Sequence, residues 1–282
     1  MQCSVINVIM TVMFNRGDFM GLIYDRQFPA FKVLGNLYSV GNIAGSVHIL
    51  DTEEGLIVFD TGYIETFGYV IDRMWRFGLD PKNIIAIFLT HGHVDHVGGA
   101  KKLREMSGAK IYISNEDRQA VTGENDLIFD KELGLKFTEF FEPDVLIADK
   151  DVFTFGKTAV RCEATPGHTA GAMSFFFDVT DGDRKYKTAI HGGAGLLTMS
   201  KDYLTRKNLP FSLRDDFIAA MDRLKNEEVD LYIGNHLEQN NTAEKYKMLC
   251  DGNELAFVNP NEWKDYCESC IAALKGMIEK EG

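Results

Sequence analysis

Short apolar blocks separated by turns make up the first half of the chain. Residues 31–61 hold three apolar runs interrupted by glycine-containing turns, which predicts a meander of strands. The apolar positions of residues 63–77 have helical spacing, and Gly78 and Pro81 follow, so we expect a helix that ends there. Further along, the patterns predict a strand over 83–89, a helix over 97–106 and a strand over 110–114.

The second half repeats this order of strands followed by helices. A hairpin turn is expected at Asp181-Gly182-Asp183, between two apolar runs. Strands followed by helices, twice over, predict an α+β fold in which two mixed sheets pack on each other and helices cover them outside, a four-layer αββα sandwich in one domain over residues 1–282. The remaining expected elements are strands over 145–147, 158–163, 173–179, 186–191 and 230–233, and helices over 212–227, 242–250 and 261–280.

Three segments flank or interrupt this scheme. Residues 1–30 are expected to be an N-terminal extension; their apolar stretch is too short to span a bilayer and no basic residue precedes it. Residues 115–142 have weak periodicity and mixed charge, and we interpret them as a helical insert that could wall a substrate cleft. Residues 242–282 are expected to hold the C-terminal helices.

Charge and cysteine content indicate which partners and which compartment to expect. A net charge of −12, from 30 basic and 42 acidic residues, disfavours a nucleic-acid partner because it repels a polyanion. Five scattered cysteines suit a reducing compartment, so a cytoplasmic protein that acts on a small molecule without a membrane or nucleic-acid partner is expected; the oligomeric state stays open. Cys267 and Cys270 form a lone CxxC, which we interpret as two helix positions one turn apart rather than a metal or redox site.

Candidate chemistry is concentrated in the run His91-Gly92-His93-Val94-Asp95-His96. It follows a predicted strand and precedes a predicted helix, so four metal-binding side chains share one turn. His91 and His93 point to the same side of an extended segment, while the turn carries Asp95 and His96 elsewhere, and one loop could therefore serve two neighbouring ions. Imidazole and carboxylate ligands suit zinc, and also iron or manganese, better than calcium.

Two further histidines could complete such a site. His168 lies in Thr165-Pro166-Gly167-His168-Thr169, where Pro166 and Gly167 set a tight turn that would present the imidazole from a stiff loop. His236 follows a short apolar strand in a comparable place. With residues 91–96 they provide six ligands, three for each ion, and leave coordination positions open for water, as catalytic zinc requires.

These motifs together resemble the metallo-β-lactamase fold superfamily over residues 34–236. The resemblance implies a dinuclear zinc site along one edge of the two sheets, with two Zn²⁺ per chain. It implies that His91, His93 and His168 hold the first ion and that Asp95, His96 and His236 hold the second. It also implies that Asp60, at the end of a strand, orients the metal loop, although an ordinary turn carboxylate is an even alternative.

One departure from the superfamily pattern is informative. Most of its hydrolases place an Asp that bridges both metals after the strand that follows the third His, but residues 189–195 here contain no carboxylate or thiol. This absence resembles the third subclass of metallo-β-lactamases. His191 could replace the missing ligand or relay protons, but we expect it to pack in a buried strand beside the site, as we expect of His48. The polar residues of 235–241 could shape the pocket, but we expect them to cap the next helix.

The expected function is zinc-dependent hydrolysis. A metal-bound hydroxide would attack a carbonyl carbon of a cyclic amide, lactone or ester, and Asp95 would accept or orient the water proton. Two alternatives remain: an iron-containing oxidoreductase on the same fold, and a metal-binding protein without catalysis. Changing His93 or His168 to Ala should remove both metal and turnover. Fold and metal site do not name a substrate.

Overall fold

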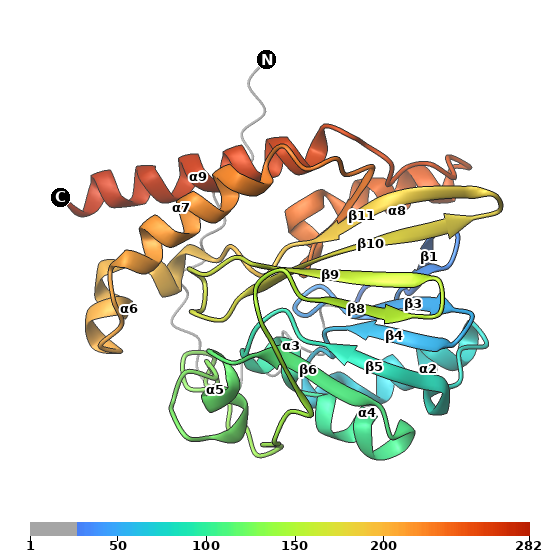
Figure 1. Ribbon diagram of the computed structural model, residues 1–282, viewed down its shortest axis with the longest axis horizontal. Helices are drawn as coiled ribbons and strands as arrows, with labels where there is room; N and C mark the ends of the chain where they lie inside the picture. The colour runs from blue at the N-terminus through green and yellow to red at the C-terminus, as the bar shows by residue number, and fades with distance from the viewer. Residues whose placement is uncertain (1–26) are drawn as a thin grey trace.

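Two β-sheets form the centre of the computed structural model, which describes residues 27–282 (Figure 1). The first sheet has seven strands in the order of the chain, antiparallel from β1 to β4 and parallel from β4 to β7. Its strands are β1 (Phe31–Leu34), β2 (Leu37–Ser39), β3 (His48–Thr52), β4 (Gly55–Phe59), β5 (Ile84–Phe88), β6 (Lys110–Ser114) and β7 (Val145–Ile147).

The second sheet has five strands in the order β12-β11-β10-β9-β8. Its neighbours pair antiparallel except β11 and β12, which are parallel. The strands are β8 (Val152–Phe155), β9 (Thr158–Ala164), β10 (Met173–Asp181), β11 (Arg184–Ile190) and β12 (Leu231–Ile233). The hairpin predicted at 181–183 joins β10 to β11.

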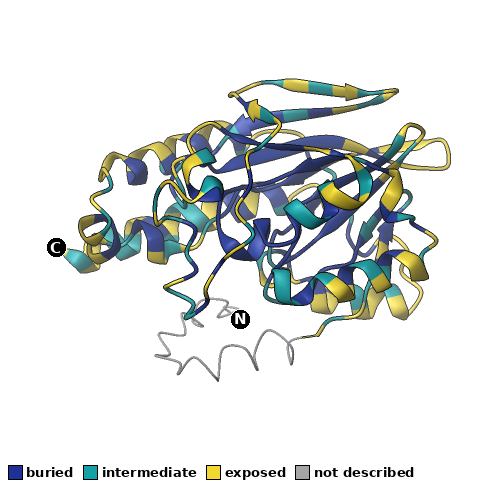
Figure 2. Cartoon of the chain, turned by 90° about the horizontal axis from the view of Figure 1, so that it is seen from below, coloured by how far each residue is buried: buried dark blue, intermediate teal, exposed yellow. Residues whose placement is uncertain are grey.

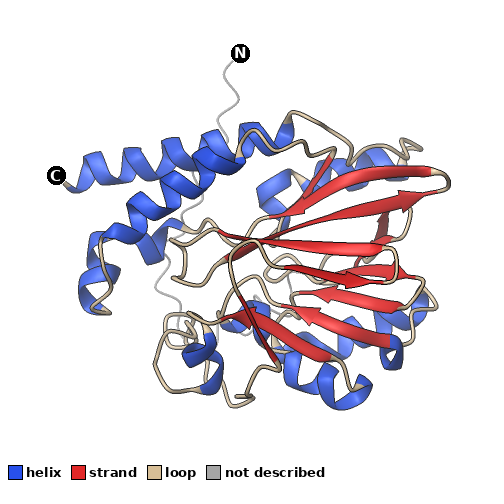
Figure 3. Cartoon of the chain, viewed as in Figure 1, coloured by secondary structure: helices blue, strands red, loops and turns tan. Residues whose placement is uncertain are grey.

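Helices lie on the outer faces of the two sheets (Figure 3). On the first sheet these include α2 (Phe67–Arg76) and α4 (Ala100–Ser107), and on the second α7 (Ser212–Leu224) and α9 (Glu262–Glu281) (Figure 1). The predicted αββα sandwich is therefore confirmed. The other helices are η1 (Ile64–Thr66), η2 (Pro81–Asn83), α3 (Val94–Val97), α5 (Arg118–Thr122), η3 (Leu196–Met199), α6 (Lys201–Arg206), η4 (Leu237–Asn240) and α8 (Thr242–Cys250).

Burial explains why strands form where the sequence is continuously apolar. In β5 the side chains of Ile84 and Ile87 belong to the core under the helices, whereas Ala86 and Phe88 belong to the core between the sheets. Between the sheets, Phe88 approaches Phe175 of β10 with ring centroids 5.4 Å apart. Such aromatic pairs contribute about 0.5–1.5 kcal/mol beyond their buried area. Figure 2 shows this buried layer between exposed outer surfaces.

Most predicted elements agree with the structure, and the differences have local causes. The helix predicted over 97–106 is two helices, α3 and α4, separated at Gly98 and Gly99. A Cβ atom on Gly98 would lie 2.5 Å from the backbone nitrogen of Ile64, so the chain passes too close for a side chain there. Strand β8 and helix α6 were not predicted; β8 has only four residues, and its Val152 and Thr154 are exposed.

The insert over residues 115–142 was expected to be helical, but only α5 (Arg118–Thr122) is helical within it. Helix α5 ends at Thr122, its C-cap Gly123 has a left-handed φ of 79°, and turns follow. Side chains bond the backbone in place of helical hydrogen bonds: Asn125 Oδ1 accepts from Leu127 N, and Asp130 Oδ2 accepts from Phe137 N. Such local bonds compete with helix formation.

Two expectations about domain organisation are not tested, or only partly, by the described residues. The N-terminal extension over 1–30 falls almost entirely outside the described residues, and the single domain over 1–282 stays a prediction. Helices α8 and α9 occupy the region predicted for the C-terminal helices. Among residues 27–282, no helix combines the length and apolar character needed to cross a bilayer.

Candidate metal centre

The six residues predicted as metal ligands form two adjacent groups of three. Within each group the candidate ligand atoms lie within 4.8 Å of one another. The imidazole rings of His91 and His96, one from each group, have centroids 4.1 Å apart. The first group is His91, His93 and His168, and the second is Asp95, His96 and His236.

Hydrogen bonds orient the imidazoles of the first group. His168 Nδ1 donates to the carbonyl oxygen of Gly195 at 2.9 Å, so its Nε2 keeps a lone pair. His91 Nδ1 lies 3.0 Å from the hydroxyl of Thr90, and its buried Nε2 has no hydrogen-bond partner. The ring of His93 stacks on Phe129 from the 115–142 segment, with centroids 4.7 Å apart.

Asp60 connects the two groups. Its Oδ2 accepts from His96 Nδ1 at 2.7 Å and from the Thr90 hydroxyl at 2.8 Å, and its Oδ1 accepts from the Thr90 backbone nitrogen at 2.7 Å. Because that hydroxyl donates to Asp60, it accepts from His91 Nδ1, and one carboxylate thus orients a histidine of each group. Asp60 has a left-handed φ of 56°, a strained conformation of the kind that clusters at functional sites. This geometry fits the orienting role expected of Asp60.

Among the described residues, His191 belongs to neither group of candidate ligands. It is fully buried, and its Nδ1 accepts from the backbone nitrogen of Gly193 at 3.0 Å. That loop also carries Gly195, the acceptor for His168, so His191 stabilises the loop that holds a candidate ligand. A Cβ atom on Gly193 would lie 2.6 Å from Cδ2 of His168, which leaves no room for a bridging carboxylate there.

Two positioning residues were not recognised from the sequence. Asp117 is buried, and it accepts from Gly92 N at 2.8 Å, from the Thr169 hydroxyl at 2.7 Å and from Gly171 N at 3.0 Å. It thereby joins the loop at 91–96 to the loop of His168. His48 was expected only to pack, but its Nε2 also donates to the carbonyl of Gly234 at 2.9 Å, two residues before His236.

Burial and mutual charge set the protonation of these groups. Burial, followed by the neighbouring histidines, holds the pKa of His91 well below its usual value, and burial lowers the pKa of His168 to about 4. Burial alone would lower the pKa of His96, but the carboxylates of Asp95 and Asp60 outweigh it and raise the pKa to about 10. Burial would likewise raise the pKa of Asp95, yet the charge of His96 lowers it.

A cavity of about 350 Å³ lies beside both groups. Its lining includes Tyr266 and Cys270 of α9 together with Glu238 and Gln239 of η4, so the C-terminal helix contributes to the site. The capping role expected for residues 235–241 was wrong, because Asn241 makes no side-chain hydrogen bond at the start of α8. The cavity is lined by His91, His168, Gly193, Ala194, Gly195, His236, Glu238, Gln239, Tyr266 and Cys270.

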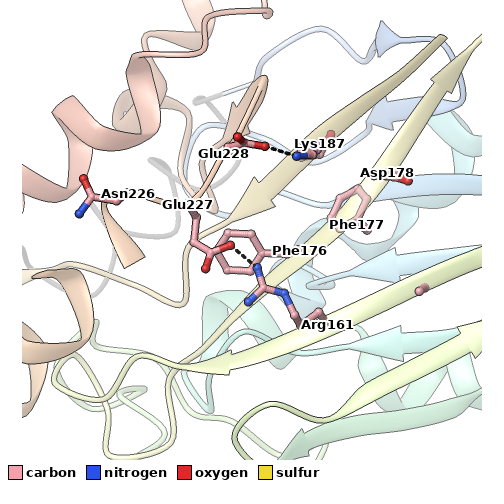
Figure 4. A pocket seen from close by; sticks show the side chains of 10 residues that line it. Arg161, Phe176, Phe177, Asp178, Lys187, Asn226, Glu227 and Glu228 are labelled. Carbon is pink, nitrogen blue, oxygen red and sulfur yellow. Dashed lines mark hydrogen bonds and ion pairs between the residues drawn. The ribbon is translucent and has the colours of Figure 1, made fainter. Parts of the chain in front are cut away.

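A second groove, of about 510 Å³, lies on the outer face of the second sheet (Figure 4). Its basic side chains point toward acidic ones: Arg161 pairs with Glu227, and Lys187 pairs with Glu228. None of the six candidate ligands lines it. Of these two hollows, only the 350 Å³ cavity is lined by candidate ligands.

The CxxC occupies two positions of one helix, as predicted, and the absence of a metal or redox role there stays a prediction. Cys267 and Cys270 lie one turn apart on α9, Cys267 buried and Cys270 half-buried, and both are free thiols. Burial raises the pKa of the Cys270 thiol to about 11. Cys3 lies outside the described residues.

Comparison with known proteins identifies the family. The model of the metallo-beta-lactamase superfamily matches residues 40–181, just over half of the 282 residues, and the chain belongs to this superfamily. It is similar in structure to a subclass B3 metallo-beta-lactamase of Bradyrhizobium japonicum, with a TM-score of 0.81, 25% identity and coverage of 90% of this chain and 95% of that one. This agrees with the resemblance to the third subclass.

Further proteins are similar to this chain in structure or in sequence. A metallo-beta-lactamase from Legionella gormanii has a TM-score of 0.82, 23% identity and coverage of 90% of this chain and 97% of that one. An uncharacterised protein of Mycobacterium leprae is 32% identical over 124 residues, 39% of this chain and 57% of that protein. A hydroxyacylglutathione hydrolase of Gloeobacter violaceus is 32% identical over 109 residues, 38% of this chain and 34% of that enzyme. The chain thus spans about a third to three fifths of these two curated relatives.

Proposed function

We propose that this protein is a metal-dependent hydrolase with two zinc ions. The observation that carries the proposal is the pair of three-residue groups beside a cavity. His91, His93 and His168 would hold one ion, and Asp95, His96 and His236 would hold the other. Three ligands for each ion leave positions for water or substrate, as in catalytic rather than structural zinc sites.

The residues fit a metal on evidence that does not depend on the family. His91 Nε2 is buried without a hydrogen-bond partner, a costly state unless a ligand occupies it. In the second group, Nε2 of His96 and Nε2 of His236 face each other at 3.2 Å, and both lie within 3.4 Å of Asp95 Oδ2. A cation would replace the proton that these atoms otherwise share, because metal binding displaces protons from its ligands.

When bound, the two ions would supply a water of lowered pKa and polarise a carbonyl group. The protein's own residues would do the rest. Asp95, which the charge of His96 keeps ionised, would accept or orient the water proton at a carboxylate oxygen. Asp60 would keep His91 and His96 directed at the ions, and Asp117 would keep the loops of the first group together.

The substrate class follows from the chemistry of the site and from the relatives. Similar proteins are named as metallo-beta-lactamases and hydroxyacylglutathione hydrolases, which act on a cyclic amide and a thioester respectively. We infer a small-molecule carbonyl substrate such as a cyclic amide, lactone, ester or thioester. A cytoplasmic location and the absence of nucleic-acid and membrane partners stay predictions.

The test is hydrolysis of a panel containing a β-lactam, a lactone, an ester and a thioester by zinc-loaded protein. We expect turnover of at least one member that chelation removes and added zinc restores. His93→Ala should lose both zinc and turnover, while Glu105→Ala, an exposed change on α4, should retain both. Bound iron with oxygen consumption, or zinc-loaded protein that hydrolyses nothing, would contradict the proposal.

A further inference from the structure

The charge of the substrate cavity is the feature that bears on specificity. None of the ten described residues that line it is Lys or Arg. Glu238 carries the only carboxylate among these ten residues. A smaller cavity next to His93 and His168 also lacks basic residues and carries Glu116 and Asp117.

Three buried basic side chains on or next to nearby helices are already engaged elsewhere. Lys207, which follows α6, lies 3.1 Å from Glu132, and Arg214 of α7 pairs with Glu281 of α9. Lys245 of α8 pairs with Glu262. These three basic side chains are each at most 10% exposed, so they are not available to pair with a ligand.

Glu238 is presented from a fixed segment. On one side of it, Gln239 Oε1 accepts from the backbone nitrogen of Asn235 at 3.0 Å. On the other, Asn240 Nδ2 donates to the carbonyl oxygen of Tyr232 at 3.0 Å. These bonds hold η4 against β12, so the backbone of Glu238 cannot easily move away from the cavity.

The two ends of the cavity differ in their exposure to solvent. His91 is buried, at 1% exposure, and belongs to the inner end, whereas Glu238 is exposed and belongs to the solvent end. A substrate with its reacting carbonyl at the ligand groups would extend its remaining part toward Glu238. Resting on the proposed function, we infer that this site takes substrates whose extending part is neutral or cationic, and that Glu238 sets this preference.

This preference separates the protein from much of the chemistry that similar sites carry out. Glutathione thioesters, for example, have carboxylates many bonds away from the reacting carbonyl. Here no described basic side chain in the cavity would pair with them, and Glu238 would repel them. Like charges at a binding surface select against wrong partners more than they change affinity for the right one.

Three matched 4-nitrophenyl esters test the inference on the full-length, zinc-loaded protein: the pentanoate, the glutarate half-ester and the 4-(trimethylammonio)butanoate. They share a reacting group and differ in the end group. With spontaneous hydrolysis subtracted, we expect kcat/KM to be lowest for the glutarate. Glu238→Lys should raise the ratio of glutarate to pentanoate kcat/KM by about fivefold, the upper range for one exposed ion pair. Glu105→Lys, with the same change in net charge, should leave the ratio unchanged.

Binding separates a failure of this inference from a failure of the proposed function. The 4-nitroanilides with the same three end groups are measured by ligand-observed NMR. If no ester is hydrolysed but the anionic anilide binds most weakly and Glu238→Lys reverses this, the proposed function fails and the inference stands. A glutarate ester or anilide that is preferred, or a Glu238→Lys variant that behaves as Glu105→Lys does, would overturn the inference.

Discussion

Replacing Asp117 by Ala should destabilise the protein through the loops that hold the first group. The change would leave the backbone nitrogens of Gly92 and Gly171 without an acceptor, whereas the half-buried Thr169 hydroxyl could reach water. An unsatisfied buried donor costs about 1–3 kcal/mol, so we expect a loss of about 2–6 kcal/mol. Burial raises the pKa of Asp117 even though three hydrogen bonds oppose this, so the buried carboxylate itself costs folding free energy. Removing the carboxylate relieves that cost, and we therefore expect a loss toward the lower end of the range.

Urea unfolding of the metal-free protein, followed by circular dichroism, measures this loss. Asp117→Asn keeps one acceptor oxygen and should lie between the wild type and Asp117→Ala. Glu116→Ala removes the neighbouring exposed carboxylate and serves as the matched control. The reasoning would be refuted if Asp117→Ala unfolded at the same urea concentration as Glu116→Ala.

The remaining predictions concern the ligands and their environment. Gly193→Asp should lower the metal content of the protein, because the new side chain would meet His168, and elemental analysis showing unchanged or increased metal would contradict this. His168→Ala should lose metal and turnover together, and full activity would count against its assignment. The metal-free protein should be most stable near pH 6.5. Above that pH, the stability that protonated His96 contributes is lost as the pH rises toward its pKa of about 10. Below that pH, the low pKa of His168, about 4, makes folding less favourable as the pH falls. Urea midpoints between pH 4 and 10 test this, and a midpoint that rises throughout would contradict it.

The grouping of the candidate ligands was predictable because their chemistry is local. Four metal-binding side chains in one turn are visible in the sequence, and the proline and glycine before His168 mark a stiff loop. Most strands were predictable because they carry buried apolar residues, in nearly continuous runs in β4 and β5. Asp60 could be proposed from its place at the end of a strand, where a short turn brings it to the metal loop.

The residues that hold the site together were less visible because their partners are distant in the chain. Asp117 is one acidic residue in a segment of mixed charge, and only the folded structure places it between Gly92 and Thr169. Tyr266 reaches the cavity because α9 packs over the second sheet, a contact that helical periodicity cannot specify. The 115–142 segment was misread because its buried side chains are separated by turns that weak periodicity does not reveal.

Crystallographic anomalous scattering at the zinc edge, on protein crystallised with zinc, tests the central claim most directly. We expect two peaks per chain, one within bonding distance of His91, His93 and His168 and the other within bonding distance of Asp95, His96 and His236. No peak at either group, or zinc bound only at Cys267 and Cys270, would contradict the account.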